Sequence, residues 1–219
     1  MTDIHSDKIL ILDFGSQYTQ LIARRVRELG VYCEVWGYDN DLATVQSFAP
    51  KGIILSGGPS TVTEQHTPRA PQGIFEMGVP VLGICYGLQC MTEMLGGGVS
   101  TSDKREFGHA DVTICADNRL ITEGSQSVWM SHGDKVTALP KGFKVIAESA
   151  NAPLCAIADE ERDFYGVQFH PEVTHSEFGK QLLSRFAHDI CVCGNSWSAS
   201  NIIKDAIYSA RTKVGDDHV

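Results

Sequence analysis

Cys85 is the residue of this 219-residue chain whose surroundings most favour covalent chemistry. It follows a short apolar run from Val81 to Ile84, has a glycine two positions away on each side, and precedes apolar residues at helical spacing. A strand, a sharp turn and a helix in this order form a nucleophile elbow. The positive end of the helix dipole would favour the thiolate. The stretch therefore predicts a nucleophilic cysteine, against the plainer interpretation of a buried structural cysteine.

A catalytic cysteine needs a base that accepts its proton and a group that orients the base. His170 follows an apolar run, and Pro171 prevents that run from continuing as a strand. Glu172 is close enough in sequence to bind the imidazole and stabilise its cation. His132 and Asp134 form a competing pair in an expected turn. Residue types alone do not choose between the two histidines.

A glycine-rich loop provides a third candidate element. Residues 56–60 read Ser-Gly-Gly-Pro-Ser and follow an apolar run. Glycines at the end of a strand expose backbone N–H groups that can bind an anion or an oxyanion. The same string is also compatible with an ordinary flexible turn.

Strands and helices alternate through the first part of the chain, which predicts an α/β fold with an open, mostly parallel, doubly wound sheet and flanking helices. In such sheets ligands bind beyond the carboxyl ends of the strands, where Cys85 and the glycine-rich loop would lie. The strands are expected at residues 8–14, 32–36, 52–56 and 81–84, and the helices at 18–29, 41–48 and 68–77.

The pattern changes after the three glycines at residues 96–98. Short β-type runs then predict a smaller β-rich addition at the sheet edge. These runs lie at residues 111–115, 127–130, 144–148, 154–158 and 164–169, and helices are expected at 177–191 and 202–214, with a linker at 195–200.

Composition excludes several classes of function. The net charge of -9 argues against binding to nucleic acid or to an anionic membrane. Seven cysteines without a signal peptide indicate free thiols in a reducing compartment. Cys191 and Cys193 lack a partner pair, so they are interpreted as surface thiols at a helix end. The remaining histidines lack metal-ligand spacing, and no metal site is expected.

The three motifs together resemble the class I (triad-type) glutamine amidotransferases. That family combines a Gly-Gly-Pro oxyanion loop, a Gly-x-Cys-x-Gly-x-Gln elbow and a His-Pro-Glu string, which occur here in that order. Each motif alone is weak evidence for this family, but the combination of the three is specific for it. The resemblance extends over residues 8–190 and implies the class I amidotransferase fold and a glutaminase that acts through a cysteine thioester.

The resemblance also implies a role for each matching residue. Cys85 would attack the side-chain amide of glutamine, His170 would transfer the proton to the leaving ammonia, and Glu172 would orient His170. The backbone N–H groups of Gly58 and Tyr86 would form the oxyanion hole. The residues expected to help bind the substrate are Gly57, Gln89, Ser131 and His132.

Longer strings narrow the resemblance to the GMP synthetase family. They cover residues 9–28, 105–108, 128–136 and 164–175. In that family an ATP pyrophosphatase domain follows, and it uses the ammonia to convert activated XMP to GMP. The resemblance therefore implies an amidotransferase domain at residues 1–193, and a linker and helix at residues 194–219 that lead to this absent domain.

Partners and cofactors follow from the same resemblance. The expected partners are L-glutamine and the ATP pyrophosphatase domain, in a homodimeric, cytoplasmic enzyme that binds neither nucleic acid nor membrane. The glutaminase reaction needs no cofactor, whereas ATP and Mg²⁺ would belong to the other domain. Residues 105–108 and 134–135 are expected to face that domain.

Two other kinds of enzyme and one binding module are the alternatives. A cysteine hydrolase of γ-glutamyl compounds could share the fold, and the chain could be the amidotransferase subunit of another synthase. A non-enzymatic docking domain could retain the fold alone. The intact Cys85, His170 and Glu172 argue against a docking domain, and Gln89 and the longer strings favour the GMP synthetase family.

Overall fold

The computed structural model describes residues 3–121, 124–176 and 178–215, without the side chains of residues 102–105. The strands are β1 (Lys8–Asp13), β2 (Tyr32–Gly37), β3 (Gly52–Leu55), β4 (Val81–Ile84), β5 (Gly98–Ile114), β6 (Ser125–Ala138), β7 (Lys144–Ser149), β8 (Ala156–Asp159) and β9 (Phe164–Val167). The helices are α1 (Thr19–Glu28), α2 (Leu42–Phe48), α3 (Tyr86–Met94), α4 (Gly179–Ser184) and α5 (Ala199–Val214), with a 3-10 turn at Ile74–Glu76 and a π-helical turn at Arg185–Ile190.

The described strands form one nine-stranded sheet in the order β2-β1-β3-β4-β9-β8-β7-β5-β6. The pairs from β2 to β9 are parallel, and those from β9 to β6 are antiparallel. The expected open α/β sheet with a β-rich addition is thus confirmed, as one continuous mixed sheet. The parallel half carries the strand ends at which ligands bind in such folds.

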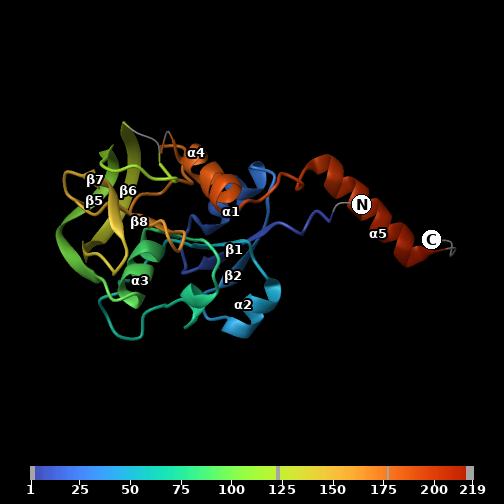
Figure 1. Ribbon diagram of the computed structural model, residues 1–219, viewed down its shortest axis with the longest axis horizontal. Helices are drawn as coiled ribbons and strands as arrows, with labels where there is room; N and C mark the ends of the chain where they lie inside the picture. Colours follow the sequence, from blue (N-terminus) through green and yellow to red (C-terminus); the bar gives the residue numbers. More distant parts are fainter. Residues whose placement is uncertain (1–2, 122–123, 177, 216–219) are drawn as a thin grey trace.

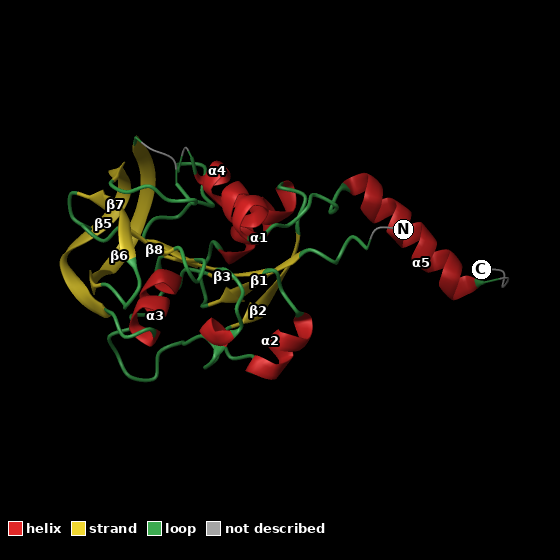
Figure 2. Ribbon diagram, in the orientation of Figure 1, coloured by secondary structure: helices red, strands yellow, loops and turns green. Residues whose placement is uncertain are grey.

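Helices cover both faces of the parallel half (Figure 2). In β1, Ile9 and Ile11 belong to the core cluster that contains buried residues of α1 and α4. Leu10 and Leu12 belong to the cluster that contains residues of α2 and α3. Successive side chains of a strand point to opposite faces, so a strand buried on both faces is apolar throughout. This explains why β1 was predictable as a run without alternation.

The antiparallel half differs from expectation in its length. Instead of short strands at 111–115 and 127–130, β5 and β6 form a long two-stranded ribbon with shifts of register near Gly98 and between Thr101 and Glu106. Along β6 buried residues alternate with more exposed ones. The expected turn at residues 131–134 is wrong, because this segment lies inside β6. A strand that is buried on one face only has polar residues between its apolar ones. For this reason the sequence did not show β6 as one continuous strand.

Two expected helices are also corrected. Residues 68–77 form only the turn Ile74–Glu76, since Pro71 interrupts the segment and Gly73 has a φ of 86°. The helix expected at 177–191 is divided into α4 and the π-helical turn, where the Cys191 N–H donates to the Phe186 carbonyl at 2.9 Å. Glu177 lies outside the described residues.

The last helix, α5, projects away from the sheet (Figure 1). It begins at a cap in which the Ser198 hydroxyl accepts a hydrogen bond from the Asn201 N–H, and none of its residues is buried. The preceding loop still contacts the sheet domain, because the Trp197 ring packs on Tyr32 and the Trp197 backbone N–H donates to the Gly30 carbonyl oxygen. The linker expected at 195–200 is therefore partly attached to the sheet domain.

Candidate functional site

Cys85 lies between β4 and α3 in a strained conformation, with φ 51° and ψ -107°. A Cβ atom at Gly83 would lie 2.6 Å from the backbone of α3, and one at Gly87 would lie 2.2 Å from the carbonyl oxygen of Leu55 in β3. Only glycine permits the two strands and the helix to approach so closely here. The strand–turn–helix geometry of a nucleophile elbow is therefore present.

His170 and Glu172 lie just beyond the end of β9, beside the elbow. His170 Nδ1 is 2.7 Å from Glu172 Oε1, and their side chains are 4% and 0% exposed. Burial opposes a charged imidazole, but hydrogen bonds with Cys85 and Glu172 outweigh burial and raise the pKa of His170 to about 10. The Glu172 carboxylate therefore holds the His170 ring in place beside the cavity that Cys85 lines.

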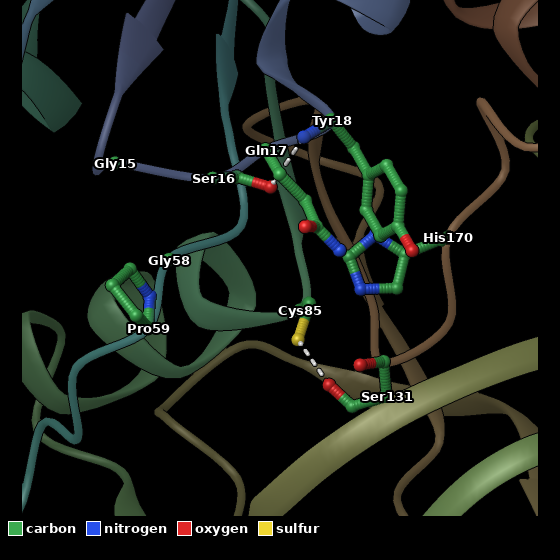
Figure 3. A pocket seen from close by; sticks show the side chains of 9 residues that line it. All are labelled: Gly15, Ser16, Gln17, Tyr18, Gly58, Pro59, Cys85, Ser131 and His170. Carbon is green, nitrogen blue, oxygen red and sulfur yellow. Dashed lines mark hydrogen bonds between the residues drawn. The ribbon is translucent and has the colours of Figure 1, made fainter.

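Two adjoining cavities meet at Cys85, with volumes of about 240 and 360 Å³. Figure 3 shows the first cavity, in which Cys85 Sγ lies 3.5 Å from the carbonyl oxygen of Ser131. Loop residues after β1 and the His170 ring also line this cavity, whereas residues of β5 and β6 line the second. The residues shared by both are Gly58, Pro59, Cys85 and Ser131.

His132 does not compete with His170 for the role of base. Its side chain is 2% exposed, with Nδ1 3.0 Å from the carbonyl oxygen of Asp134 and Nε2 3.0 Å from Glu106 Oε2. Burial lowers the pKa of His132, although Glu106 partly opposes this effect. With both ring nitrogens engaged, His132 has no nitrogen left for the Cys85 proton. The geometry thus favours His170, which sequence alone could not select.

Two backbone N–H groups beside Cys85 are available to a ligand. Among the described residues, neither the N–H of Gly58 nor that of Tyr86 donates a hydrogen bond within the protein. Tyr86 is the first residue of α3, where N–H groups lack helical partners. A Cβ atom at Gly58 would lie 2.8 Å from the carbonyl oxygen of Phe14, so this position also requires glycine.

The model of the family described as "Glutamine amidotransferase class-I" matches residues 10–190 of this chain. The chain belongs to the class-I glutamine amidotransferases. The matched range contains the elbow, the glycine-rich loop and the His170–Glu172 pair.

Curated relatives of this amidotransferase carry the description "GMP synthase [glutamine-hydrolyzing]". The protein of Vibrio vulnificus strain CMCP6 is 56% identical over 219 residues, which cover 99% of this chain and 42% of that protein. The protein of Alteromonas mediterranea is 56% identical over 228 residues, which cover 100% of this chain and 43% of that protein. The chain thus spans less than half the length of these relatives.

Solved structures of similar fold include a Thermoplasma acidophilum protein described as a "putative gmp synthase subunit a protein". It has a TM-score of 0.73 and 27% identity, and the match covers 91% of this chain and 98% of that protein. A Thermotoga maritima glutamine amidotransferase has a TM-score of 0.66 and 17% identity, with coverage of 84% and 98%. The second likeness supports the fold alone.

The positions expected to bind substrate in this amidotransferase have different surroundings. Ser131 lines both cavities, and a Cβ atom at Gly57 would lie 3.2 Å from the His170 ring. Gln89 lines the second cavity, but its amide nitrogen already donates to the Asp134 carbonyl at 3.0 Å and to Gln168 Oε1 at 3.3 Å. Only the oxygen of Gln89 is left for a substrate group.

Sequence reasoning missed four residues near the nucleophile. Ser16, Gln17 and Tyr18 follow β1 and line the first cavity, and the Tyr18 ring packs edge-on at 5.2 Å from that of His170. The rule that ligands bind beyond strand ends could have identified them. Gln168 donates to Cys85 Sγ at 3.7 Å. Its position before the His-Pro-Glu string carried no separate signal.

Other expectations concern features outside the elbow. Cys191 and Cys193 are each 5% exposed, so their interpretation as surface thiols is wrong. Burial raises the pKa of Cys193 to about 11.

In the described part of the chain, no three His, Cys, Asp or Glu residues are grouped to hold a metal ion. None of the helices in that part is long and apolar enough to cross a membrane. The side chain of Arg105 is not described.

Proposed function

We propose that this chain is the glutaminase part of a GMP synthase. It hydrolyses L-glutamine to glutamate and ammonia, and the ammonia serves the ATP-dependent amination of XMP to GMP. One observation carries the proposal: Cys85, His170 and Glu172 are assembled beside a cavity, in a chain 56% identical to glutamine-hydrolysing GMP synthases over nearly its whole length.

The first half of the reaction forms a thioester. The Cys85 sulfur attacks the side-chain carbonyl carbon of glutamine, and the carbonyl electron pair moves to the oxygen. The N–H groups of Gly58 and Tyr86 hold this oxyanion. His170, which carries the former thiol proton, donates it to the amide nitrogen, the C–N bond breaks, and ammonia leaves.

Water completes the cycle. His170 is neutral after protonating ammonia, so it can accept a proton from a water molecule that attacks the thioester carbonyl. Collapse of the second tetrahedral intermediate breaks the C–S bond and releases glutamate. The proton returns to the Cys85–His170 pair. Glu172 keeps the His170 ring in one orientation throughout, through the 2.7 Å hydrogen bond.

The remaining roles belong to the whole enzyme. An ATP pyrophosphatase domain receives the ammonia and uses ATP with Mg²⁺, whereas the glutaminase reaction uses no cofactor. Residues 1–193 form the amidotransferase domain, and residues 194–219 lead to the other domain. The complete enzyme is a cytoplasmic homodimer that binds neither nucleic acid nor membrane. For this chain alone, the net charge of -9 argues against both kinds of binding.

Labelling with the glutamine analogue 6-diazo-5-oxo-norleucine tests this proposal. We expect a single adduct on Cys85, found by peptide mass spectrometry, that excess glutamine prevents. The Cys85→Ala variant should remain unlabelled, whereas Cys90→Ala, which removes a buried thiol of the same helix, should be labelled like the unchanged protein. Labelling that is insensitive to glutamine would contradict the proposal.

Reconstitution tests the assignment to GMP synthesis. The chain is mixed with the synthetase part of one of the curated relatives, together with glutamine, XMP, ATP and Mg²⁺. We expect glutamine-dependent formation of GMP that is lost with Cys85→Ala and restored by added ammonia. Formation of GMP from ammonia but not from glutamine would show that this chain serves another synthase.

A further inference from the structure

Ser56 follows the last residue of β3 and is completely buried, with 0% exposure. Its hydroxyl makes two hydrogen bonds: it accepts from the Phe14 N–H at 3.0 Å and donates to the carbonyl oxygen of Gly57 at 2.8 Å. The Ser56 N–H also donates to the Leu12 carbonyl at 3.0 Å. Ser56 thus attaches the glycine-rich loop to the end of β1.

The direction of these hydrogen bonds is determined by chemistry. The Phe14 N–H can only donate, so it occupies an acceptor site of the Ser56 hydroxyl. The single hydroxyl proton is therefore free to go to the Gly57 carbonyl. The result is a directional link from the backbone of β1 to one particular peptide group of the loop.

That peptide group also contains the N–H of Gly58. The described residues include no cis peptide bond, and in a trans peptide the C=O and the following N–H point in opposite directions. By holding the Gly57 carbonyl, Ser56 turns the Gly58 N–H the other way. Gly58 lines both cavities beside Cys85, and its N–H has no partner among the described residues.

The peptide between Gly57 and Gly58 has a particular need for such a restraint. Neither flanking residue has a Cβ atom, so no side chain of its own limits the rotation of this peptide plane. A rotated peptide would present a carbonyl oxygen instead of an N–H to the cavity. An oxygen there would repel a developing oxyanion, which an N–H stabilises.

We propose that Ser56 is a positioning residue that keeps the Gly58 N–H directed at the oxyanion formed on Cys85. This inference rests on the proposed glutaminase function and deepens it. Ser56 does not touch the substrate, so its loss should weaken stabilisation of the transition state while leaving glutamine binding unchanged.

The test compares Ser56→Ala with Ser149→Ala in the 219-residue chain. Ser149 is a suitable control because its buried hydroxyl accepts a hydrogen bond from the Ala152 N–H at 3.1 Å, in β7 and outside the cavities lined by Cys85. Three measurements are made: steady-state kinetics with glutamine, which give kcat and KM, the rate of Cys85 alkylation by iodoacetamide, and the glutamine concentration that half-protects Cys85. Alkylation by iodoacetamide forms no oxyanion, so it reports on the nucleophile alone.

For Ser56→Ala we expect kcat to fall by about 10-fold to 100-fold, less than the roughly 100-fold to 1,000-fold for complete loss of one oxyanion donor. The alkylation rate and the half-protecting glutamine concentration should stay within about twofold of the unchanged protein, and Ser149→Ala should leave all three unchanged. Ser56→Thr retains the hydroxyl, so its kcat should be much closer to that of the unchanged protein than the kcat of Ser56→Ala is. Thermal melting of each variant identifies those that are folded.

Two results would overturn the inference on Ser56. An unchanged kcat in folded Ser56→Ala would show that the hydroxyl does not position the donor. Loss of glutamine protection together with kcat would indicate general damage to the site. Failure of the proposed function is distinct, because the unchanged protein itself would then show neither glutamine hydrolysis nor protection of Cys85 by glutamine, and the role of Ser56 would fall with it.

Discussion

The charge of His170 depends on two neighbouring side chains. Hydrogen bonds with Cys85 and Glu172 raise its pKa against the opposing effect of burial. Glu172 is itself buried, and its Oε2 has no partner among the described residues, so His170 is its chief counter-charge. Removal of one partner of a buried pair leaves the other charge uncompensated. The pair is therefore sensitive to conservative substitution.

Replacement Glu172→Gln tests this coupling. The pKa of His170 is about 10 in the folded chain and 6.5 ordinarily, so its contribution to stability is fully present below pH 6.5 and is lost as the pH rises to about 10. Glu172→Gln removes one cause of the raised pKa. We expect the difference in free energy of unfolding between the two proteins to shrink as the pH rises through this window, and kcat to fall about 100-fold or more.

Urea denaturation at several pH values and NMR titration of His170 provide the measurements. The matched control is Glu148→Gln, since Glu148 is an exposed residue of β7. The difference in free energy of unfolding between Glu148→Gln and the unchanged protein should not vary with pH in this range. A His170 pKa that is the same in the unchanged protein and in Glu172→Gln would contradict the assignment of Glu172 as its partner.

At the scale of elements, the elbow exists because β3, β4 and α3 approach more closely than side chains would permit. Gly83 and Gly87 are the contact points, and the strained Cys85 lies between them. Strain of this kind persists only where surrounding structure determines it. Packing of β3 against α3 thus determines where the sulfur is placed.

Substitution Gly87→Ala should separate these elements, because its Cβ would lie 2.2 Å from the Leu55 carbonyl oxygen. We expect a loss of about 3 kcal/mol in the free energy of unfolding, measured by urea denaturation, and no labelling of Cys85 by the glutamine analogue. Gly96→Ala is the control, since none of the described residues other than its chain neighbours has an atom within 4 Å of its added Cβ. It should cost only about 1–2 kcal/mol for its left-handed conformation. Equal losses in the two variants would refute the steric argument.

A second histidine–carboxylate pair joins the two strands of the β5–β6 ribbon to each other. Glu106 in β5 binds His132 Nε2 at 3.0 Å and accepts a hydrogen bond from Asn151 Nδ2 at 2.9 Å. Ser131, whose carbonyl oxygen contacts Cys85 Sγ, is the neighbour of His132 in β6. His132 thus joins β6 to β5 and also lines the second cavity, so its expected contact with the substrate stays a prediction.

Removal of the Glu106 carboxylate should therefore loosen the ribbon. Glu106→Ala leaves the buried Nε2 of His132 without its partner, so we expect a loss of about 1–3 kcal/mol in the free energy of unfolding. The pKa of His132 should fall further, because Glu106 raises it in the unchanged protein. Calorimetry and NMR titration measure the two effects, with Glu148→Ala as the exposed control. A His132 pKa that rises or stays constant would argue against the pair.

At the scale of the whole molecule, the sheet domain and α5 are distinct in their packing. Helix α5 projects away from the sheet (Figure 1). It buries none of its residues, and Ile203, Ile207 and Tyr208 are exposed. The loop before it is attached through Trp197, which packs on Tyr32 with ring centroids 4.7 Å apart. The packed part of the chain therefore continues beyond residue 193.

Two truncated chains test this boundary. A chain that ends at Ser198 retains Trp197 and should keep its melting temperature within about 1 °C, because α5 buries nothing. A chain that ends at Cys193 loses the Trp197 contacts, so its melting temperature should be a few °C lower. In a domain of this size, each kcal/mol of lost stability lowers the melting temperature by roughly 2–4 °C. Differential scanning calorimetry provides the comparison. An equal decrease in both chains would mean that α5 contributes to the stability of the sheet domain.

The sequence by itself determined the features that depend on neighbours along the chain. The apolar runs of β1, β3 and β4 predicted the parallel half of the sheet, because a strand buried on both faces is apolar throughout. The helix expected at residues 41–48 is α2, and the carboxylate of its N-cap residue Asp41 accepts a hydrogen bond from the Thr44 N–H at 2.9 Å. The glycine spacing around Cys85 predicted the elbow, since close crossing of backbones requires glycine locally.

Only the tertiary structure decided matters that depend on residues far apart in sequence. It favoured His170 over His132, because Glu106 occupies the second nitrogen of His132 from another strand. It placed Gln17 at the first cavity, and it placed the Asp134 carbonyl oxygen where the amide nitrogen of Gln89 donates to it. It also showed the length of the β5–β6 ribbon and the burial of Cys191, which depend on pairing and packing between distant segments. Local spacing cannot encode such contacts, since they form only when the sheet assembles.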